Sequence, residues 1–244
     1  MKVELLHVTP LDIAIHAIRK CYDSEEKSDS YWTTENSVCH KNEFFLGEKD
    51  KKLIKQIIAS GHTSTIEHIN FSFELSGYSR ALLQEKSRHR IASVSERSTR
   101  YCLGNMKNEK PFLIPKLNFM DVDQFHWDEI KKYIVLTGIE QVDQSSALAL
   151  ENLRLCIVAG IPNDKAKFCL PDSLQSECVF TINARSLRNW FHLRTNKRAM
   201  WEIRKLAYKM FEVIPEDYKF IFEDCMFEYG KDIRYGDLIN TSSV

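Results

Sequence analysis

Four arginines, one histidine and three serines fall within the fourteen residues RHRIASVSERSTRY, from Arg88 to Tyr101. Two guanidinium groups about 4 Å apart repel each other by roughly 4 kcal/mol near a protein surface. Such a cluster is therefore stable only when its members spread into solvent, or when carboxylates or a bound anion lie among them. Guanidinium forks, hydroxyls and backbone N–H groups are the usual holders of phosphate, at about 1.5–3 kcal/mol per charge-assisted hydrogen bond. The segment is thus a candidate site for a phosphate-bearing small molecule.

A purely structural interpretation of the same segment is also open. A helix ending near Arg90 would carry the cationic residues RHR in its last turn, where each cation contributes about 0.3–1 kcal/mol. Arg97 and Arg100 would then be solvated, or paired with nearby glutamates for roughly 0–1 kcal/mol. However, Arg88 and Arg90 face nearly opposite sides of a helix, so at least one must enter the irregular stretch that follows. There the serines accompany Arg97 and Arg100, which favours a bound ligand.

The composition of the chain excludes several other classes of protein. The 244 residues hold 34 basic and 34 acidic side chains, so no global field attracts nucleic acid or an anionic membrane. The longest apolar run, residues 155–161, is far too short to span a bilayer, and the start MKVELLHVTP resembles no secretion signal. Seven cysteines form no C-x-x-C pair, which favours a reduced, cytoplasmic protein without structural zinc or a disulfide framework.

The motifs that usually bind nucleotides or metals are missing. The eight glycines are never two positions apart, which excludes G-x-G-x-x-G and the P-loop. The nucleophile pattern G-x-S-x-G and the zinc pattern H-E-x-x-H are also missing. His62 and His68 are six residues apart, a spacing that is not helical, so we expect no metal. Side chains and scattered backbone amides must therefore hold any nucleotide.

The hydrophobic pattern predicts one α+β domain over residues 1–244, with a central mixed or antiparallel sheet flanked by helices. The clearest strand covers residues 68–75, where Ile69, Phe71, Phe73 and Leu75 alternate with polar residues, and Gly77 is expected to end it. Weaker strands are expected over residues 3–7 and 179–183.

Helices are expected at several positions along the chain. Thr9 is expected to be the N-cap of the first helix, with Pro10 at its first position. Gly61 is expected to end the second helix in a left-handed turn. The expected helices cover residues 10–21, 53–60 and 79–90, residues 127–159 with an interruption near Gly138, a short stretch up to residue 170, and residues 187–211 with a break near Thr195. Residues 23–52 are expected to be an irregular and mobile surface segment.

The arginine segment carries the pattern R-H-R-x-x-S-x-x-x-x-S-x-R, which resembles the signature of the flavin-dependent thymidylate synthases. The pattern is formed by Arg88, His89, Arg90, Ser93, Ser98 and Arg100. Four further stretches resemble elements of that family and follow in the same order along the chain. They are GHTSTIEH at residues 61–68, KFCLP at residues 167–171, NARSLRNWFHLR at residues 183–194 and AMWEI at residues 199–203.

The resemblance implies a fold of the thymidylate synthase-complementing type and an enzyme that methylates dUMP at C5 to give dTMP. Family members take the carbon unit from 5,10-methylenetetrahydrofolate and reducing equivalents from NADPH through bound FAD, and they form homotetramers with shared active sites. No nucleic acid or membrane partner is implied. The residues that would contact FAD are His62, Ser64, Arg88, His89, Arg90, Glu96, Asn183, Ala184, Arg185 and Asn189. The residues that would hold dUMP are Glu85, Lys86, Ser87, Arg88, Glu96, Arg97, Ser98, Thr99, Arg100, Lys167 and Arg194.

The chemistry of the side chains bears on the roles of Arg194 and Asn183. By the resemblance Arg194 would be the catalytic residue, a permanently charged donor that stabilises negative charge developing on the pyrimidine. Asn183 could equally be only the cap of the helix that follows it. Its spacing to Arg185 and Asn189 favours a ligand contact.

The chain departs from the family pattern at a few positions. Ser95, Thr99 and the pair Thr65-Ile66 differ from the residues common in the family. Lys167 stands where an arginine is commoner, which keeps the charge and gives up the bidentate fork. The competing hypothesis is a non-enzymatic nucleotide- or RNA-binding module that uses residues 88–100 to grip phosphate, and it predicts a strong salt dependence of binding.

Overall fold

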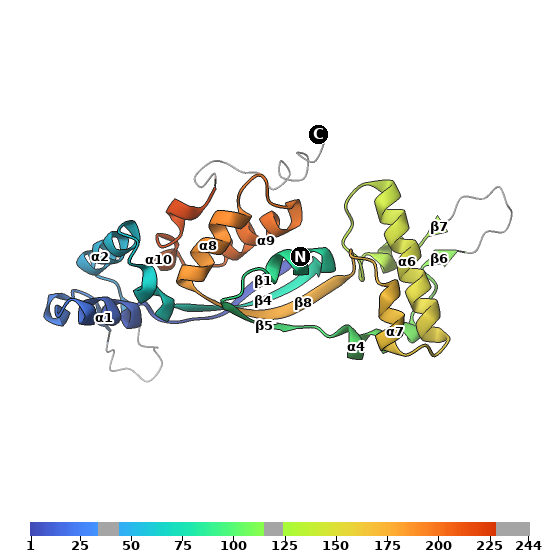
Figure 1. Ribbon diagram of the computed structural model, residues 1–244, viewed down its shortest axis with the longest axis horizontal. Coiled ribbons are helices and arrows are strands. Elements are labelled where there is room, and N and C mark those ends of the chain that lie inside the picture. Colours follow the sequence, from blue (N-terminus) through green and yellow to red (C-terminus); the bar gives the residue numbers. More distant parts are fainter. Residues whose placement is uncertain (34–43, 115–123, 228–244) are drawn as a thin grey trace. The chain divides into compact units, whose positions relative to one another are not determined.

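The computed structural model describes residues 1–33, 44–114 and 124–227. They divide into two compact units. The largest sheet has four strands in the order β1-β4-β8-β5 (Figure 1). Unit 1 comprises residues 1–2, 75–88 and 95–178, and unit 2 comprises residues 3–74, 89–94 and the chain from residue 179 onward. The α+β class with a sheet flanked by helices is confirmed. That the whole chain is a single domain stays a prediction.

The sheet is antiparallel where its hydrogen bonds fix the register. Its strands are β1 (Lys2–Val8), β4 (Asn70–Ser79), β8 (Gln175–Asn183) and β5 (Ala92–Glu96). In unit 2 the Ser72 hydroxyl lies 2.8 Å from that of Thr181, and in unit 1 the Arg80 N–H donates to the Leu174 carbonyl at 3.0 Å. Because rising numbers in one strand meet falling numbers in the other, β4 and β8 run in opposite directions.

The strand predicted over residues 68–75 is confirmed, but it ends later than predicted. Ile69, Phe71, Phe73 and Leu75 are all fully buried. The prediction that Gly77 ends the strand is wrong, because β4 continues to Ser79. Gly77 has φ +71°, and a Cβ built on it would lie 3.1 Å from the backbone nitrogen of Met1. The glycine therefore lets the strand bend beside the N-terminus without ending the pairing.

Unit 2 has an aromatic core beneath its helices. Phe71 meets Phe222 edge to face at 5.5 Å between ring centroids, and Phe222 meets Phe191 in the same way at 5.3 Å. Helix α8, which carries Phe191, packs against α9 (Figure 1). The elements of the unit besides the sheet strands are α1 (Leu11–Cys21), η1 (Glu25–Lys27), β2 (Tyr31–Trp32), β3 (Phe44–Phe45), α2 (Glu48–Ala59), η2 (Thr63–His68), α8 (Ala184–Arg194), α9 (Trp201–Glu212), α10 (Glu216–Lys219) and η5 (Glu223–Cys225).

The first helix begins later than predicted. Helix α1 starts at Leu11, and Pro10 occupies the cap position without a side-chain hydrogen bond. The prediction that Thr9 is the N-cap is wrong, because its hydroxyl accepts a hydrogen bond from the Asn70 N–H at 3.1 Å. The start of β4 therefore holds the hydroxyl that would otherwise cap the helix.

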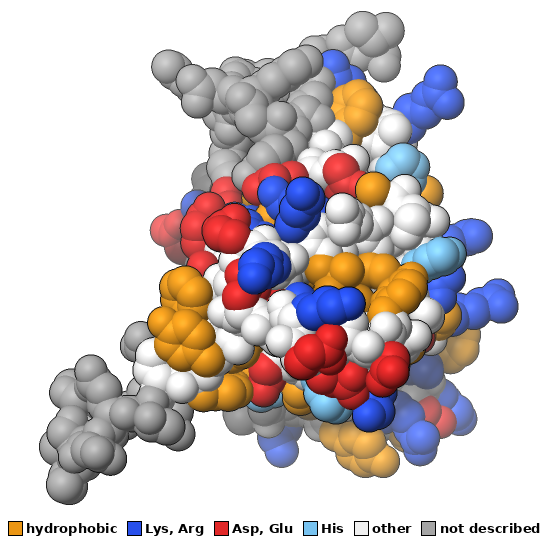
Figure 2. Space-filling view, turned by 90° about the vertical axis from the view of Figure 1, so that its left-hand side faces the viewer, with side chains coloured by type: hydrophobic (Ala, Val, Ile, Leu, Met, Phe, Trp, Pro, Cys, Tyr) orange, Lys and Arg blue, Asp and Glu red, His pale blue; other side chains and the backbone are white. Residues whose placement is uncertain are grey.

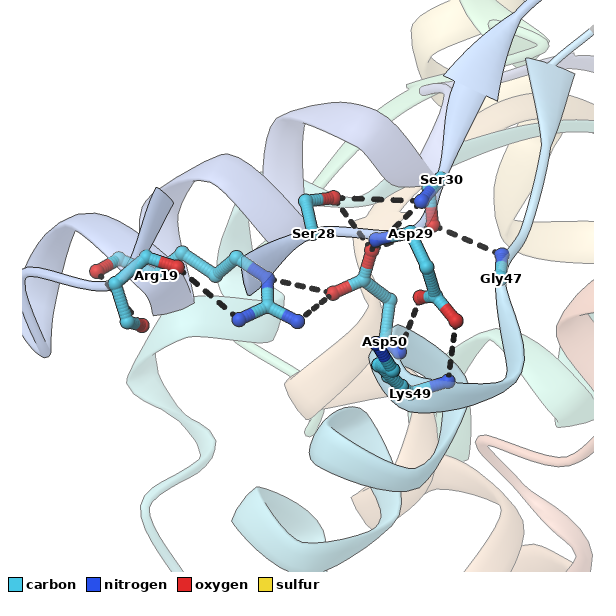
Figure 3. Close-up of polar contacts among 8 residues, drawn as sticks. Arg19, Ser28, Asp29, Ser30, Gly47, Lys49 and Asp50 are labelled. Atoms are coloured by element: carbon cyan, nitrogen blue, oxygen red, sulfur yellow. Dashed lines mark hydrogen bonds and ion pairs between the residues drawn. The ribbon is translucent and has the colours of Figure 1, made fainter. Parts of the chain in front are cut away.

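The segment between α1 and α2 is built around a buried carboxylate, Asp50 (Figure 3). Arg19 donates to Asp50 Oδ1 from Nε at 2.6 Å, and the hydroxyls of Ser28 and Ser30 each donate to Oδ2 at 2.6 Å. Burial alone would raise the pKa of Asp50, but these hydrogen bonds outweigh it and leave the pKa below its usual value. The expectation of an irregular segment up to residue 52 is corrected here, while residues 34–43 lie outside the described part of the chain.

A second carboxylate explains why α2 begins at Glu48, five residues earlier than the sequence pattern suggests. Asp29 accepts hydrogen bonds from the backbone N–H groups of Lys49 at 2.9 Å and Asp50 at 3.1 Å. These are donors of the first helical turn, which has no intrahelical acceptors for them. Gly61, with φ +79°, lies just beyond the end of α2 as predicted.

Unit 1 has its own apolar core, in which Phe112, Ile130, Leu150 and Leu153 are fully buried. The predicted helix over residues 127–159 is in fact two helices, α5 and α6, and the break is longer than expected. Asp143 holds this break, because its carboxylate accepts from the Thr137 and Gly138 backbone N–H groups at 2.7 and 3.0 Å. The elements of the unit besides the sheet strands are α3 (Arg80–Lys86), α4 (Thr99–Cys102), η3 (Leu103–Asn108), β6 (Leu113–Ile114), β7 (Gln124–Phe125), α5 (Trp127–Ile130), α6 (Glu140–Val158), α7 (Asn163–Ala166) and η4 (Lys167–Cys169).

The surface carries charges of both signs. Figure 2 shows one face on which Lys and Arg side chains lie among Asp and Glu side chains, with apolar side chains between them. In the described ranges no helix combines the length and the apolar character that crossing a bilayer requires. Nor does the described part of the chain bring three His, Cys, Asp or Glu side chains into a group that could hold a metal ion.

Candidate active site

The arginine segment begins where α3 ends. Ser79 caps this helix by accepting from the Leu82 N–H at 3.2 Å, and Ser87 closes it with a hydroxyl that donates to the Gln84 carbonyl at 2.9 Å. The prediction that residues 88–90 form the last turn of the helix is therefore wrong. The chain turns away after Ser87, so the helix dipole does not explain the clustered cations. Both Arg88 and Arg90 are exposed.

The middle of the segment is a strand, although the sequence suggests an irregular stretch. Residues 92–96 form β5, and in unit 1 the Arg97 N–H donates to the Glu177 carbonyl at 2.9 Å. The Arg97 guanidinium lies 3.7 Å from the Glu177 carboxylate, an exposed pair worth roughly 0–1 kcal/mol. Ser98 then precedes the short helix α4, whose Arg100 carbonyl accepts from the Asn163 side chain at 2.8 Å.

A buried charge cluster in unit 1 surrounds the carboxylate of Glu96. The Lys86 ammonium, whose side chain is only 2% exposed, donates to Glu96 Oε2 at 2.6 Å. The hydroxyls of Tyr78 and Ser176 donate to Glu96 Oε1 at 2.6 and 2.5 Å. The same ammonium reaches the Tyr78 hydroxyl at 2.8 Å and the Cys178 sulfur at 3.0 Å. Three separate elements, β4, α3 and β8, therefore meet at the end of β5.

Burial affects two members of this cluster, the Tyr78 phenol and the Cys178 thiol. It raises the pKa of Tyr78, and the neighbouring Cys178 thiol and Glu96 carboxylate raise it further, so the phenol keeps its proton and donates it. Burial likewise raises the pKa of the Cys178 thiol, although Lys86 acts in the opposite direction. Moving an ion pair out of water costs several kcal/mol per ion unless hydrogen bonds satisfy both partners. Here they do.

A second pair of predicted site residues meets in unit 2. Arg194, in the last turn of α8, donates from Nε to Nε2 of His89 at 2.9 Å. The His89 ring packs against Trp190, with 4.6 Å between ring centroids, and Trp190 in turn contacts Phe180 at 5.5 Å. Because arginine always donates, His89 Nε2 is an acceptor, and the proton of the neutral ring is on Nδ1.

The NARSLRNW residues, 183–190, form the N-cap and the first turns of α8. Asn183 is the N-cap, since its Oδ1 accepts from the Ser186 N–H at 2.8 Å, while its contact with a ligand stays a prediction. Ala184 is fully buried and its N–H donates to the Ile69 carbonyl at 2.8 Å. Arg185 pairs with Glu67 of the GHTSTIEH stretch at 2.6 Å. Two stretches 118 residues apart in sequence are thereby joined.

Every predicted site residue falls into one of the two units. Unit 1 holds Glu85, Lys86, Ser87, Arg88, Glu96, Arg97, Ser98, Thr99, Arg100 and Lys167. Unit 2 holds His62, Ser64, His89, Arg90, Asn183, Ala184, Arg185, Asn189 and Arg194. Of these, Lys167 lies at the start of η4, next to α7, while His62, Ser64 and Asn189 are exposed.

Three residues of the Glu96 cluster were missed from the sequence: Tyr78, Ser176 and Cys178. A signal for the cluster does exist, since Lys86 follows Leu82 by four positions and so lies on the buried face of α3. A lysine on an apolar helix face requires a buried partner. The sequence alone does not show which strand supplies it.

The fold and these clusters define an α+β protein with exposed cations and a part-buried carboxylate, Glu96, that accepts hydrogen bonds from three side chains. The family described as Thymidylate synthase complementing protein (Thy1) matches residues 4–217 of the chain. Among curated proteins, the chain is 44% identical over 235 residues to the flavin-dependent thymidylate synthase of Campylobacter jejuni (strain RM1221), covering 96% of this chain and 100% of that protein. It is 42% identical over 231 residues to that of Wolinella succinogenes, covering 94% and 100%.

Among solved structures, the chain is similar to the flavin-dependent thymidylate synthase ThyX from Helicobacter pylori complexed with FAD and dUMP. The TM-score is 0.80 at 40% sequence identity, and the match covers 93% of this chain and 100% of that chain. The chain therefore belongs to the Thy1 family, the flavin-dependent thymidylate synthases. The family that the five sequence stretches suggest is confirmed.

Proposed function

We propose that this protein binds FAD and dUMP and catalyses the reductive methylation of dUMP to dTMP. The carbon donor is 5,10-methylenetetrahydrofolate and the reductant is NADPH. The observation that carries the proposal is the likeness, over 93% of the chain, to a Helicobacter pylori enzyme whose structure contains FAD and dUMP. We also propose the homotetramer and the cytoplasmic location that the family resemblance implies.

Three of the side chains that would hold FAD, those of Arg88, Arg90 and Asn183, have donors available for its diphosphate. Within the described residues, Arg88 and Arg90 are exposed and make no side-chain hydrogen bond or ion pair. Asn183 uses its Oδ1 as a helix cap, which leaves its NH₂ group for a ligand. The other proposed contacts to FAD are those of His62, Ser64, His89, Glu96, Ala184, Arg185 and Asn189. Bound FAD would supply the hydride.

The residues proposed to hold dUMP provide donors for a phosphate and an acceptor for a ring or ribose donor. The resemblance implies contacts from Glu85, Lys86, Ser87, Arg88, residues 96–100, Lys167 and Arg194, and we propose direct contacts for all of these except Lys86. Arg97, Arg100 and Lys167 are cations, and the Glu96 carboxylate accepts. Arg194 would hold positive charge beside the pyrimidine, and its Nε–H bond to His89 fixes the plane of the guanidinium.

The absorption spectrum of the purified protein tests the proposal. We expect a yellow protein, or a colourless one that becomes yellow with added FAD, whose flavin spectrum changes when dUMP is added. Protein that takes up no FAD would contradict the proposal. The RNA-binding alternative predicts salt-dependent binding to many nucleic acids instead, whereas a mononucleotide pocket predicts selectivity for one base.

A further inference from the structure

Lys86 has no hydrogen-bond donor left for a ligand. An ammonium group has three N–H donors, and those of Lys86 lie at 2.6 Å from Glu96 Oε2, 2.8 Å from the Tyr78 hydroxyl and 3.0 Å from the Cys178 sulfur. Its side chain is 2% exposed. A direct contact between this ammonium and a nucleotide would require breaking one of these bonds inside the protein.

Glu96, in contrast, has capacity to spare. Each oxygen of an ionised carboxylate accepts about two hydrogen bonds. Among the described residues, Oε1 already accepts from Tyr78 and Ser176, at 2.6 and 2.5 Å, while Oε2 accepts only from Lys86. The Glu96 side chain is 24% exposed, so part of it reaches the surface. Oε2 is thus the oxygen with room for a donor from a ligand.

Stability alone does not explain the ion pair between the buried Lys86 and the part-buried Glu96. Replacing such pairs with apolar side chains of similar volume is often neutral or stabilising. An apolar residue at position 86 would fit the buried face of α3 that already carries Leu82. What the lysine adds is a charge opposite to that of the carboxylate and a fixed partner, at 2.6 Å, for one of its oxygens.

We infer that Lys86 and Tyr78 are positioning residues, which act on the nucleotide through Glu96 and do not touch it themselves. They hold the carboxylate in one orientation, with Oε2 open toward an N–H or O–H donor of dUMP. This inference rests on the proposed function and replaces the direct dUMP contact that the family resemblance implies for Lys86.

A double-mutant cycle tests whether Lys86 acts through Glu96. In the wild-type background, Lys86→Met should raise the Kd for dUMP, measured by titrating the flavin spectrum, by about tenfold, the change expected from weakening one charge-assisted hydrogen bond. The FAD content, and kcat at saturating dUMP, should change by less than about threefold. In the Glu96→Gln background the same substitution should change Kd by less than about twofold, because the group through which it acts is gone.

Lys132→Met is the matched control. Lys132 also lies 2.6 Å from a carboxylate, that of Glu129, but its side chain is 61% exposed. This variant should bind dUMP like the wild type. Should Lys86→Met fail to fold, Tyr78→Phe takes its place in the cycle, since it keeps the ion pair and removes one donor from Oε1.

Two outcomes would overturn the inference alone. One is an equal rise in Kd from Lys86→Met, or from Tyr78→Phe in its place, in both backgrounds, which would mean that the side chain meets the nucleotide directly. The other is an unchanged Kd in the wild-type background. A wild-type protein whose spectrum shows no FAD uptake and whose titration shows no dUMP binding would instead overturn the proposed function, and the inference with it.

Discussion

Arg194 donates a hydrogen bond from Nε to Nε2 of His89 at 2.9 Å, although the two residues are 105 positions apart in the sequence. His89 belongs to the RHR stretch and Arg194 ends the NARSLRNWFHLR stretch, so the bond joins two of the five family elements within unit 2. Trp190 packs against the same imidazole. The imidazole accepts this hydrogen bond only while Nε2 is unprotonated. Because Trp190 holds the imidazole, the bond in turn fixes the orientation of the guanidinium.

Arg194→Lys should lower kcat strongly. Lysine keeps the charge but has no Nε to bind His89 and no planar fork. Removing one preorganised donor at a site of developing charge lowers kcat by about 100-fold or more. Steady-state assay of dTMP formation, with FAD content measured on the same sample, checks this. The control is Arg198→Lys, at an exposed position of unit 2; equal losses in both variants would contradict the assigned role.

Asn183 should prove to have two roles that substitution can separate. Asn183→Ala removes the cap of α8 and should lower the free energy of unfolding by about 1 kcal/mol. Asn183→Asp keeps an acceptor for the Ser186 N–H and should restore stability. It has no NH₂ group, however, so the proposed FAD contact would be lost. Urea unfolding and FAD occupancy measure the two effects, and full occupancy in Asn183→Asp would leave the residue as a cap only.

Asp50 should make unfolding depend on pH in acid. Its pKa in the folded protein lies below the value of about 3.9 expected when unfolded. The carboxylate therefore stabilises the fold fully above that unfolded value, and the contribution is lost as pH falls through the folded pKa. Asp50→Asn leaves Arg19 buried without a charged partner and should cost about 3 kcal/mol at pH 7.

Unfolding measured at several pH values checks this role of Asp50. The difference in unfolding free energy between the wild type and Asp50→Asn should shrink below about pH 4, because protonated Asp50 then resembles asparagine. Asp128→Asn is the control, since its carboxylate is 97% exposed in a surface pair with Lys131. A difference that stays constant from pH 7 to pH 3 would contradict the structural account.

Glu67→Gln should change stability very little. The pair with Arg185 is 2.6 Å long but both side chains are about half exposed, at 43% and 54%. Exposed pairs contribute roughly 0–1 kcal/mol, so the free energy of unfolding should fall by less than about 1 kcal/mol. Thermal or urea unfolding measures it. A loss as large as that expected for Asp50→Asn would contradict the exposed placement of this pair.

Local patterns predict the parts of this fold that local physics decides. Phe71 and Phe73 alternate with polar residues because one face of β4 is buried, and that alternation is visible in the sequence. Gly61, Gly138 and Gly160 all have positive φ where the chain was expected to leave a helix. The five family stretches identify the family because the sequence itself contains their residue types and their order.

Long-range partners account for what the sequence does not reveal. Residues 92–96 contain no alternation strong enough to predict a strand, and the strand β5 exists because β8 lies beside it. Thr9 fails as a cap because Asn70, 61 residues later, takes its hydroxyl. Lys86 could be recognised as a buried charge on an apolar helix face, but its partners come from β4, β5 and β8.

Product analysis with labelled substrate tests the central claim most directly. Purified protein loaded with FAD is incubated with dUMP, NADPH and 5,10-methylenetetrahydrofolate labelled in its methylene carbon, and the nucleotides are separated. The proposed function predicts dTMP that carries the label, and none when dUMP or FAD is left out. Flavin-loaded protein that binds dUMP and oxidises NADPH, yet transfers no label to the nucleotide, would contradict it.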